Sequence, residues 1–148
     1  MKSMHDKKFA TSAVALVKGR IRDRDASLNS RDFLDELVKK TGFLDKAPFL
    51  WIGVTIFYGI KNDLKCRFRK IDPKDGELEV GLELDMEILQ WADKNNLDLL
   101  RDIFMIAGLE VILQVGKKYK LPTHAFEEER KKYGNIPNTI EECESYSR

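Results

Sequence analysis

The short run Asp63-Leu64-Lys65 has the residue types of half of a metal-dependent nuclease centre. In such a centre carboxylates hold Mg²⁺, and a lysine stabilises the negative charge that develops during the reaction. The chemistry also needs a further carboxylate that converges on the metal, and the residues flanking this run do not mark one. The sequence therefore favours the plainer interpretation, a turn aspartate beside an ion pair between strands.

Glu110 is the second residue that could do chemistry, because it interrupts the apolar stretch from Ile103 to Val115. Ionised carboxylates are rarely buried without a partner. If it is buried, Glu110 is either an acid with a raised pKa or the anchor of a polar network. The alternative, which we favour from the sequence, is that the helix turns it toward solvent beside Gln114.

The familiar enzyme motifs are absent from the sequence. It contains no glycine-rich phosphate loop, no His-Glu-x-x-His, no Cys-x-x-Cys and no Gly-x-Ser-x-Gly. Its two histidines, His5 and His124, lie far apart along the chain, which is typical of surface residues rather than ligands. We therefore expect no catalytic residue, no metal site and no cofactor.

Three segments, 49–58, 64–69 and 77–84, alternate apolar and polar residues with the period of a β-strand. We expect them to form an antiparallel three-stranded meander with one face on the core. The core face would carry Leu50, Ile52, Val54, Ile56, Leu64, Cys66, Phe68, Leu78, Val80, Leu82 and Leu84. The opposite face would carry Trp51, Thr55, Phe57, Lys65, Arg67, Arg69, Glu79 and Glu83.

The loop 72–76 contains Asp, Pro and Gly, the residues that short hairpin loops use. A hairpin centred there sets Arg69 opposite Glu79 and Lys65 opposite Glu83. It also sets Phe68 opposite Val80 and Cys66 opposite Leu82. Opposite charges facing each other across strands stabilise that register, and a slip by one residue would reverse both faces.

The segment 59–63 forms the other turn of the expected meander, with a less distinct turn signal. Antiparallel pairing around it would bring Thr55 near Arg67 and Phe57 near Lys65. The first two strands would then be direct neighbours in the sheet, as consecutive strands commonly are.

Helical periodicity accounts for most of the remaining chain. We expect helices at 31–41 with Asn29 or Ser30 as N-cap, from Met86 to about Asn95, from Leu97 to Lys120, and around Phe126 to Tyr133. Residues 12–22 fit either a helix or a strand, and a strand is favoured. We expect residues 23–30 to be a polar loop. Residues 135–148 are expected to be either a small helix or a flexible tail. The prediction is a single α+β domain over 1–148, with an antiparallel sheet packed on one face by helices.

Composition narrows the class of protein. The chain has 148 residues, 43% apolar and 34% charged, with a net charge of +1, which suits a folded domain without the basic field of a nucleic-acid-binding protein. The two cysteines do not make a disulfide framework, which fits a reducing compartment. The apolar run 13–17 is too short for a signal peptide, so we expect a cytoplasmic protein that does not enter a membrane.

The polar face of the predicted sheet has two possible uses and one structural alternative. Its three cations, with Trp51 and Phe57 as stacking platforms, could bind nucleic acid, although the opposing glutamates should neutralise them. Large aromatics mixed with arginine and charges of both signs are typical of protein–protein surfaces. Alternatively, the N-terminal segment of the chain could cover this face. The candidate partner-binding residues are Trp51, Thr55, Phe57, Arg67, Arg69, Glu79 and Glu83.

Four segments resemble a known family: Lys18-Gly19-Arg20-Ile21-Arg22, Ser27-Leu28-Asn29-Ser30, Ala47-Pro48-Phe49, and Gly116-Lys117-Lys118-Tyr119-Lys120-Leu121-Pro122. Over roughly residues 13–130 the chain resembles bacterial immunity proteins of polymorphic-toxin and contact-dependent inhibition systems, most closely the immunity protein 39 type. The resemblance implies a small cytoplasmic α+β protein, encoded beside a toxin, that binds the toxin and blocks it, either by stoichiometric occlusion of its active site or by locking it in an inactive state. It transfers no contact residues, and neither the toxin nor the oligomeric state follows from it.

Overall fold

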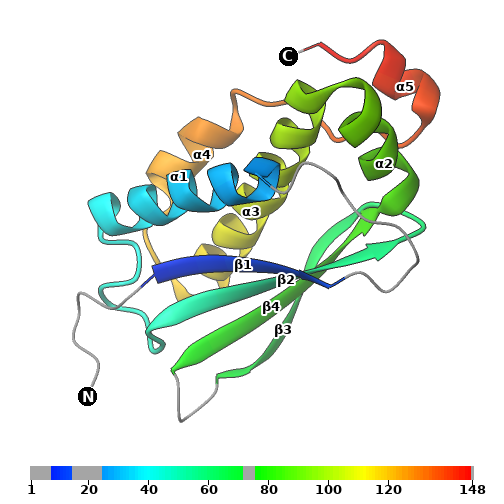
Figure 1. Cartoon of the computed structure of the whole chain (residues 1–148). Coiled ribbons are helices and arrows are strands. Elements are labelled where there is room, and N and C mark those ends of the chain that lie inside the picture. The colour runs from blue at the N-terminus through cyan, green and yellow to red at the C-terminus, as the bar shows by residue number, and fades with distance from the viewer. Residues whose placement is uncertain (1–7, 15–24, 72–75, 148) are drawn as a thin grey trace.

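In a computed structural model of the chain, residues 8–14, 25–71 and 76–147 are described, and they form one sheet with helices on one side of it (Figure 1). The elements are β1 (Lys8–Val14), α1 (Asp25–Thr41), β2 (Trp51–Gly59), β3 (Asp63–Ile71), β4 (Glu77–Asp85), α2 (Met86–Asn95), α3 (Leu97–Tyr119), α4 (His124–Arg130) and α5 (Ile140–Glu144). The α+β class with helices packed on one sheet face is confirmed.

The sheet is mixed rather than antiparallel. Its strand order is β1-β2-β4-β3, with β1 parallel to β2, β2 parallel to β4, and only β3 antiparallel to its neighbour. The predicted meander is therefore wrong in its first pairing, because β4 lies between β2 and β3. Thr55 pairs with Gly81 and Phe57 with Glu83, instead of lying opposite the cations of β3.

Strand composition explains why β4 takes the central place. Val80, Gly81 and Leu82 of β4 are all buried, whereas Lys65 and Arg67 of β3 are exposed. Exposed cations suit an edge strand, since they discourage pairing with another chain. The apolar alternation of the sequence reports which face of a strand is buried and carries no information about its neighbour.

The link between β2 and β3 is long enough to pass the end of β4. Two strands that flank a third lie about 10 Å apart, and the chain from Gly59 to Asp63 can reach about 13 Å. Asn62 holds the β2–β3 connection against the end of β4, because its Oδ1 accepts a hydrogen bond of 2.9 Å from the backbone N–H of Asp85. The same side chain donates from Nδ2 to the carbonyl oxygen of Pro137 at 2.9 Å.

The β3–β4 hairpin follows the predicted register over its central part. Phe68 lies opposite Val80 and Arg67 opposite Gly81, and Arg69 forms the predicted ion pair with Glu79 at 3.7 Å. The register shifts toward the start of β3, so that Glu83 lies opposite Asp63 and the predicted Lys65–Glu83 pairing is wrong. The loop residues 72–75 lie outside the described residues, and Gly76 beside them has a φ of +64°.

The core lies between the sheet and the helices. The central positions of the predicted apolar face, such as Ile52, Val54, Leu78 and Val80, are buried, and α3 buries side chains on most of its circumference because α1, α2, α4 and β3 all pack against it. No helix among the described residues is long and apolar enough to cross a bilayer.

In three segments the structure corrects the sequence prediction or adds to it. Helix α1 begins at Asp25, so residues 25–30 are helical rather than a loop, and Ser30 is a buried helix residue rather than a cap. Residues 12–14 are strand, as favoured, and 15–22 lie outside the described part of the chain. In the C-terminal segment Ile136, Pro137 and Cys143 are buried, the last of these in α5.

Candidate partner-binding face of the sheet

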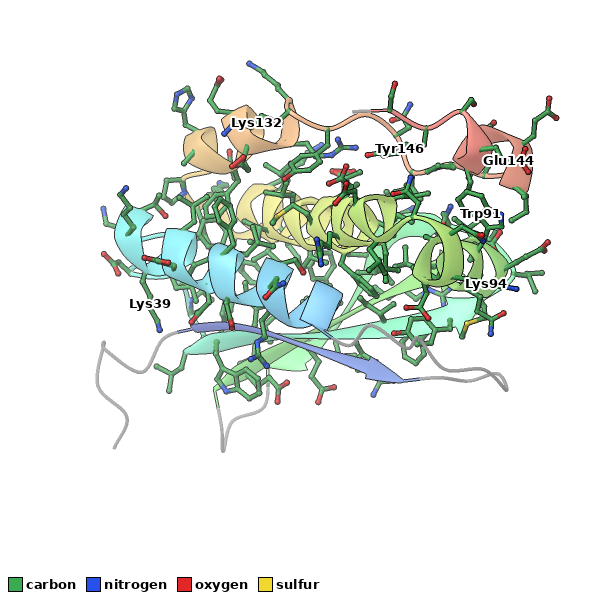
Figure 2. All side chains as sticks on the ribbon, turned by 45° about the horizontal axis from the view of Figure 1, so that its top comes forward. Lys39, Trp91, Lys94, Lys132, Glu144 and Tyr146 are labelled. Atoms are coloured by element: carbon green, nitrogen blue, oxygen red, sulfur yellow. The ribbon has the colours of Figure 1, made fainter. Side chains whose placement is uncertain are left out.

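The side of the sheet turned away from the helices is the candidate site, and we call it the open face. Figure 2 shows side chains that point from the sheet away from the helical layer, and within the described ranges no helix packs over them. Strand β1 pairs with the edge of β2 instead of covering this face. The structure places all of the predicted partner-binding residues here: Trp51, Thr55, Phe57, Arg67, Arg69, Glu79 and Glu83.

The strand register leaves the middle of the open face hollow. Across β2, β4 and β3 the central row is Thr55, Gly81 and Arg67, with no side chain on the central strand. The space above Gly53 is occupied by the carboxylate of Glu77, because a Cβ at Gly53 would be only 1.9 Å from its Oε1.

The ring of Phe57 divides this hollow. A Cβ at Gly81 would come within 2.9 Å of Phe57 Cε2, so the ring lies against the glycine. On one side is a depression of about 180 Å³, lined by Phe57, Asp63, Lys65, Arg67, Leu82 and Glu83. On the other is a depression of about 370 Å³, lined by Thr55, Phe57, Arg69, Glu77, Glu79, Val80 and Gly81. An aromatic wall between two charged recesses can receive the side chains of another protein.

The charges of the open face are arranged unevenly. Arg69 is paired with Glu79, and both side chains are well exposed, so the pair contributes little stability. Lys65 and Arg67 are exposed, and their side chains form no ion pair with any residue that the structure describes. These two cations border the smaller depression and are available to a partner.

The Asp63-Leu64-Lys65 run gains a second carboxylate from the fold, because Glu83 lies opposite Asp63 and lines the same depression. However, Asp63 Oδ1 accepts a hydrogen bond of 3.1 Å from the N–H of Lys65, as a turn aspartate does. The carboxylate of Glu83 lies against Gly59, where a Cβ would be 2.4 Å from its Cδ. Within the described residues no three acidic, histidine or cysteine side chains are grouped so as to hold a metal.

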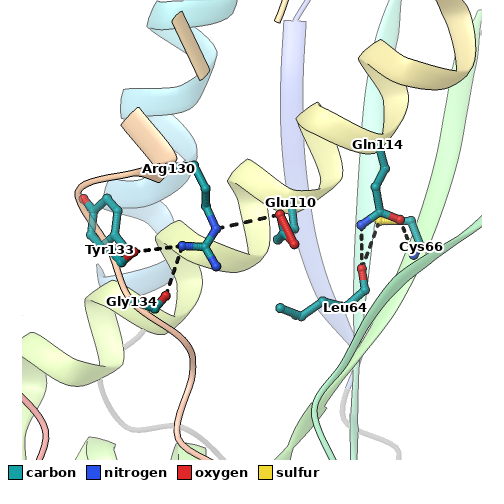
Figure 3. A network of polar contacts seen from close by, with 7 residues as sticks. All are labelled: Leu64, Cys66, Glu110, Gln114, Arg130, Tyr133 and Gly134. Atoms are coloured by element: carbon teal, nitrogen blue, oxygen red, sulfur yellow. Dashed lines mark hydrogen bonds and ion pairs between the residues drawn. The ribbon is translucent and has the colours of Figure 1, made fainter. Parts of the chain in front are cut away.

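Glu110 serves as the anchor of a polar network on the helical side (Figure 3). Its Oε2 lies 3.7 Å from Arg130 Nε, and both side chains are less than a third exposed. Arg130 Nη1 donates to the carbonyl oxygens of Tyr133 (3.1 Å) and Gly134 (3.0 Å). The network anchor is the interpretation that fits the contacts, because the ion pair joins the end of α4 to α3, while the Glu110 side chain keeps 29% of its surface exposed.

Gln114, one turn further along α3, closes the outer edge of β3 (Figure 3). The N–H of Cys66 donates to Gln114 Oε1 at 2.8 Å, and Gln114 Nε2 donates to the carbonyl oxygen of Leu64 at 2.6 Å. The amide thus replaces a neighbouring strand at an edge that could otherwise pair with another chain. Sequence reasoning missed this role, although a lone amide near Glu110 in an apolar helix was a usable signal.

Fold and face together define a class: an α+β protein whose helices cover one side of a mixed sheet and whose other side offers aromatic and charged groups. Within that class, the family model for Immunity protein 39 matches residues 3–132, and the chain belongs to the immunity protein 39 family. Membership implies an immunity protein that binds a toxin, and it suggests a non-catalytic role. No curated protein and no solved structure matches the chain.

Proposed function

We propose that this protein neutralises its cognate toxin in the cytoplasm by binding it stoichiometrically through the open face, without catalysis. The observation that carries the proposal is the middle of that face. There Phe57 lies against Gly81, and Arg67, which is exposed and forms no ion pair among the described residues, stands opposite Gly81. Aromatic and arginine side chains beside a recess are the groups that most often dominate binding energy between proteins.

The size of the open face suits such an interface. Strands β2, β3 and β4 have 9 residues each, so the patch is about 30 Å long and about 15 Å wide. A stable interface buries about 800 Å² on each partner. The flat area of the three strands, about 450 Å², is a little more than half of that value, so the relief of the side chains and an adjoining turn would have to supply the rest.

A protein partner explains the charge pattern better than nucleic acid does. Phosphate backbones need a continuous positive surface. On the open face, Glu77, Glu79 and Glu83 line the two depressions together with the cations. Alternating signs would repel part of a phosphate chain, whereas a protein surface can match them group by group.

Rescue of growth tests the proposal. The protein encoded in the adjacent reading frame is expressed with the wild-type chain or with Arg67→Glu, and growth and complex formation are measured. We expect rescue and a 1:1 complex with wild type, and loss of both with Arg67→Glu. Lys40→Glu, an exposed cation on α1 on the helical side, is the matched control and should rescue fully. A toxic neighbour that the wild type neither binds nor neutralises would contradict the proposal.

A further inference from the structure

We infer that toxin binding is anchored at one end of the open face, the end formed by the β2–β3 turn, and that the toxin surface received there is an apolar pocket bordered by carboxylates. We call this region the turn end and define it by Ile60, Lys61 and Lys65; Arg67 of the central row borders it across the smaller depression. The inference rests on the proposed function and specifies where and with what chemistry the partner is held.

The first observation is the high exposure of the Ile60 side chain. Its side chain is 91% exposed, whereas the other exposed large apolar side chains of the described residues, Phe33 and Leu97, are 42% exposed. A β-branched side chain has few rotamers and therefore loses little freedom when it is bound. An isoleucine that projects at the tip of a turn is shaped to enter a pocket.

The turn that presents Ile60 is fixed from two directions. Asn62 accepts from the backbone of Asp85 at the end of β4 and donates to Pro137 of the C-terminal segment, both at 2.9 Å. Pro137 is itself buried. A contact presented on a fixed support avoids the ordering cost that weakens binding by loose loops.

The turn end is continuous with the smaller depression of the open face. That depression is lined by Phe57 at the end of β2 and by Asp63 and Lys65 at the start of β3, the two strands that the turn connects. The carboxylate of Glu83, which also lines it, lies against Gly59, the residue before Ile60. A projecting aliphatic group and a recess with an aromatic wall thus belong to one surface.

The charges of the turn end give the chemistry of the partner. Lys61, Lys65 and Arg67 are exposed, and none of the three forms an ion pair within the described ranges, whereas Asp63 and Glu83 are half-buried. The exposed charged groups of the turn and of β3 are therefore cations around an aliphatic tip, whereas the exposed carboxylate of Glu142 lies next to Asn138, which Asn62 contacts. Complementary charge requires carboxylates on the partner around the pocket that receives Ile60.

This chemistry separates the turn end from inhibitors that imitate nucleic acid. Such a mimic must present negative charge to a basic cleft, and the turn end presents the opposite sign. If the toxin is a nuclease, the turn end lies on an acidic region of it, beside the phosphate-binding surface or over carboxylates that hold a metal.

Titration calorimetry and salt-dependent association kinetics with the toxin domain from the adjacent reading frame test the inference. Ile60→Ala should weaken binding by about tenfold or more, from the apolar area lost, and Ile60→Asp by more. The double change Lys61→Glu with Lys65→Glu should slow association and reduce its dependence on salt. Leu97→Ala, an exposed apolar residue of α3, is the control and should bind as wild type does. Unchanged melting temperatures will show that each variant is folded.

Each outcome decides between the claims. If wild type does not bind the toxin domain, the proposed function and this inference fail together. If Thr55→Arg in the middle of the open face abolishes binding while the variants of Ile60 and Lys61 bind within about twofold of wild type, the proposed function stands and the turn-end anchor is wrong. If the wild-type chain binds a labelled RNA or DNA that Lys61→Glu with Lys65→Glu no longer binds, the cations serve nucleic acid and the inference is overturned.

Discussion

At the scale of single residues, Cys66 shows how the fold removes reactivity from a side chain. Burial is the main cause that raises the pKa of its thiol from 9.0 to about 12, and the negative charges of Glu110 and Asp63 add to the effect. Only the thiolate is a strong nucleophile. The folded protein therefore keeps Cys66 protonated at neutral and moderately alkaline pH.

This shift predicts a pH dependence of stability. Above about pH 9 the unfolded chain releases the thiol proton, while the folded chain retains it up to about pH 12. The folded state then binds more protons, so the stabilisation that Cys66 provides is complete below about pH 9 and is lost between these values. In urea titrations, the stability difference between wild type and Cys66→Ala should shrink as pH rises through this window. A constant difference would contradict the shifted pKa.

At the scale of elements, Gln114 determines how α3 is held against the edge of the sheet. Its amide is matched to one donor and one acceptor of β3, the N–H of Cys66 and the carbonyl of Leu64. Gln114→Leu preserves the size of the side chain and leaves both backbone groups without this partner. We expect the free energy of unfolding to fall by about 1–3 kcal/mol, measured by urea denaturation.

Gln90→Leu is the matched control, because Gln90 is exposed on α2. It should change stability by less than about 0.5 kcal/mol. Because the uncovered edge of β3 could pair with another chain, Gln114→Leu should also increase self-association in light scattering. A monomeric variant as stable as wild type would show that the amide does not protect this edge.

The element scale also shows what the sequence could and could not predict. The boundaries of β2, β3 and β4 and of α2 and α3 follow from apolar period and capping residues. For example, Asp85 caps α2 by accepting hydrogen bonds from the backbone N–H groups of Glu87 and Ile88. The order of the strands does not follow from the sequence. The alternation that turns Phe57 of β2 toward the open face is the same whether the neighbouring strand is β3 or β4. The grouping of residues on the open face was predictable, since it depends on alternation alone.

The residues that sequence analysis missed act through long-range contacts. Asn62 meets Asp85 and Pro137, and Gln114 meets Leu64 and Cys66, across separations that no local pattern records. Ile60 looks like an ordinary turn residue until the surrounding structure shows how far it projects. Sequence analysis therefore predicted which residues share the open face but did not single out the turn that borders it.

At the scale of the whole molecule, Asn62 joins three parts of the chain that are distant in sequence: the β2–β3 turn, the junction of β4 and α2, and the C-terminal segment. The C-terminal segment, residues 135–147, lies beyond residues 3–132, which the family model covers. It nevertheless buries Ile136, and Tyr146 donates from its hydroxyl to the buried carboxylate of Asp102. A segment outside the family match therefore supports the turn that borders the open face.

This arrangement predicts that one side-chain amide links the order of the turn to the order of the C-terminal segment. Asn62→Ala removes the hydrogen bonds to Asp85 and Pro137 and the longer one to Asn138. Amide hydrogen exchange should therefore speed up in the β2–β3 turn and in residues 136–143 together, with stability lowered by about 1–3 kcal/mol. Asn135→Ala, at an exposed position near the same segment, should leave both regions protected. Faster exchange in the turn alone would mean that the C-terminal segment is held by its buried side chains and that Asn62 couples nothing. Joint loss of protection would instead show that contacts outside the family match help to fix a surface within it, because the backbone of Pro137 and the tip at Ile60 share a single support.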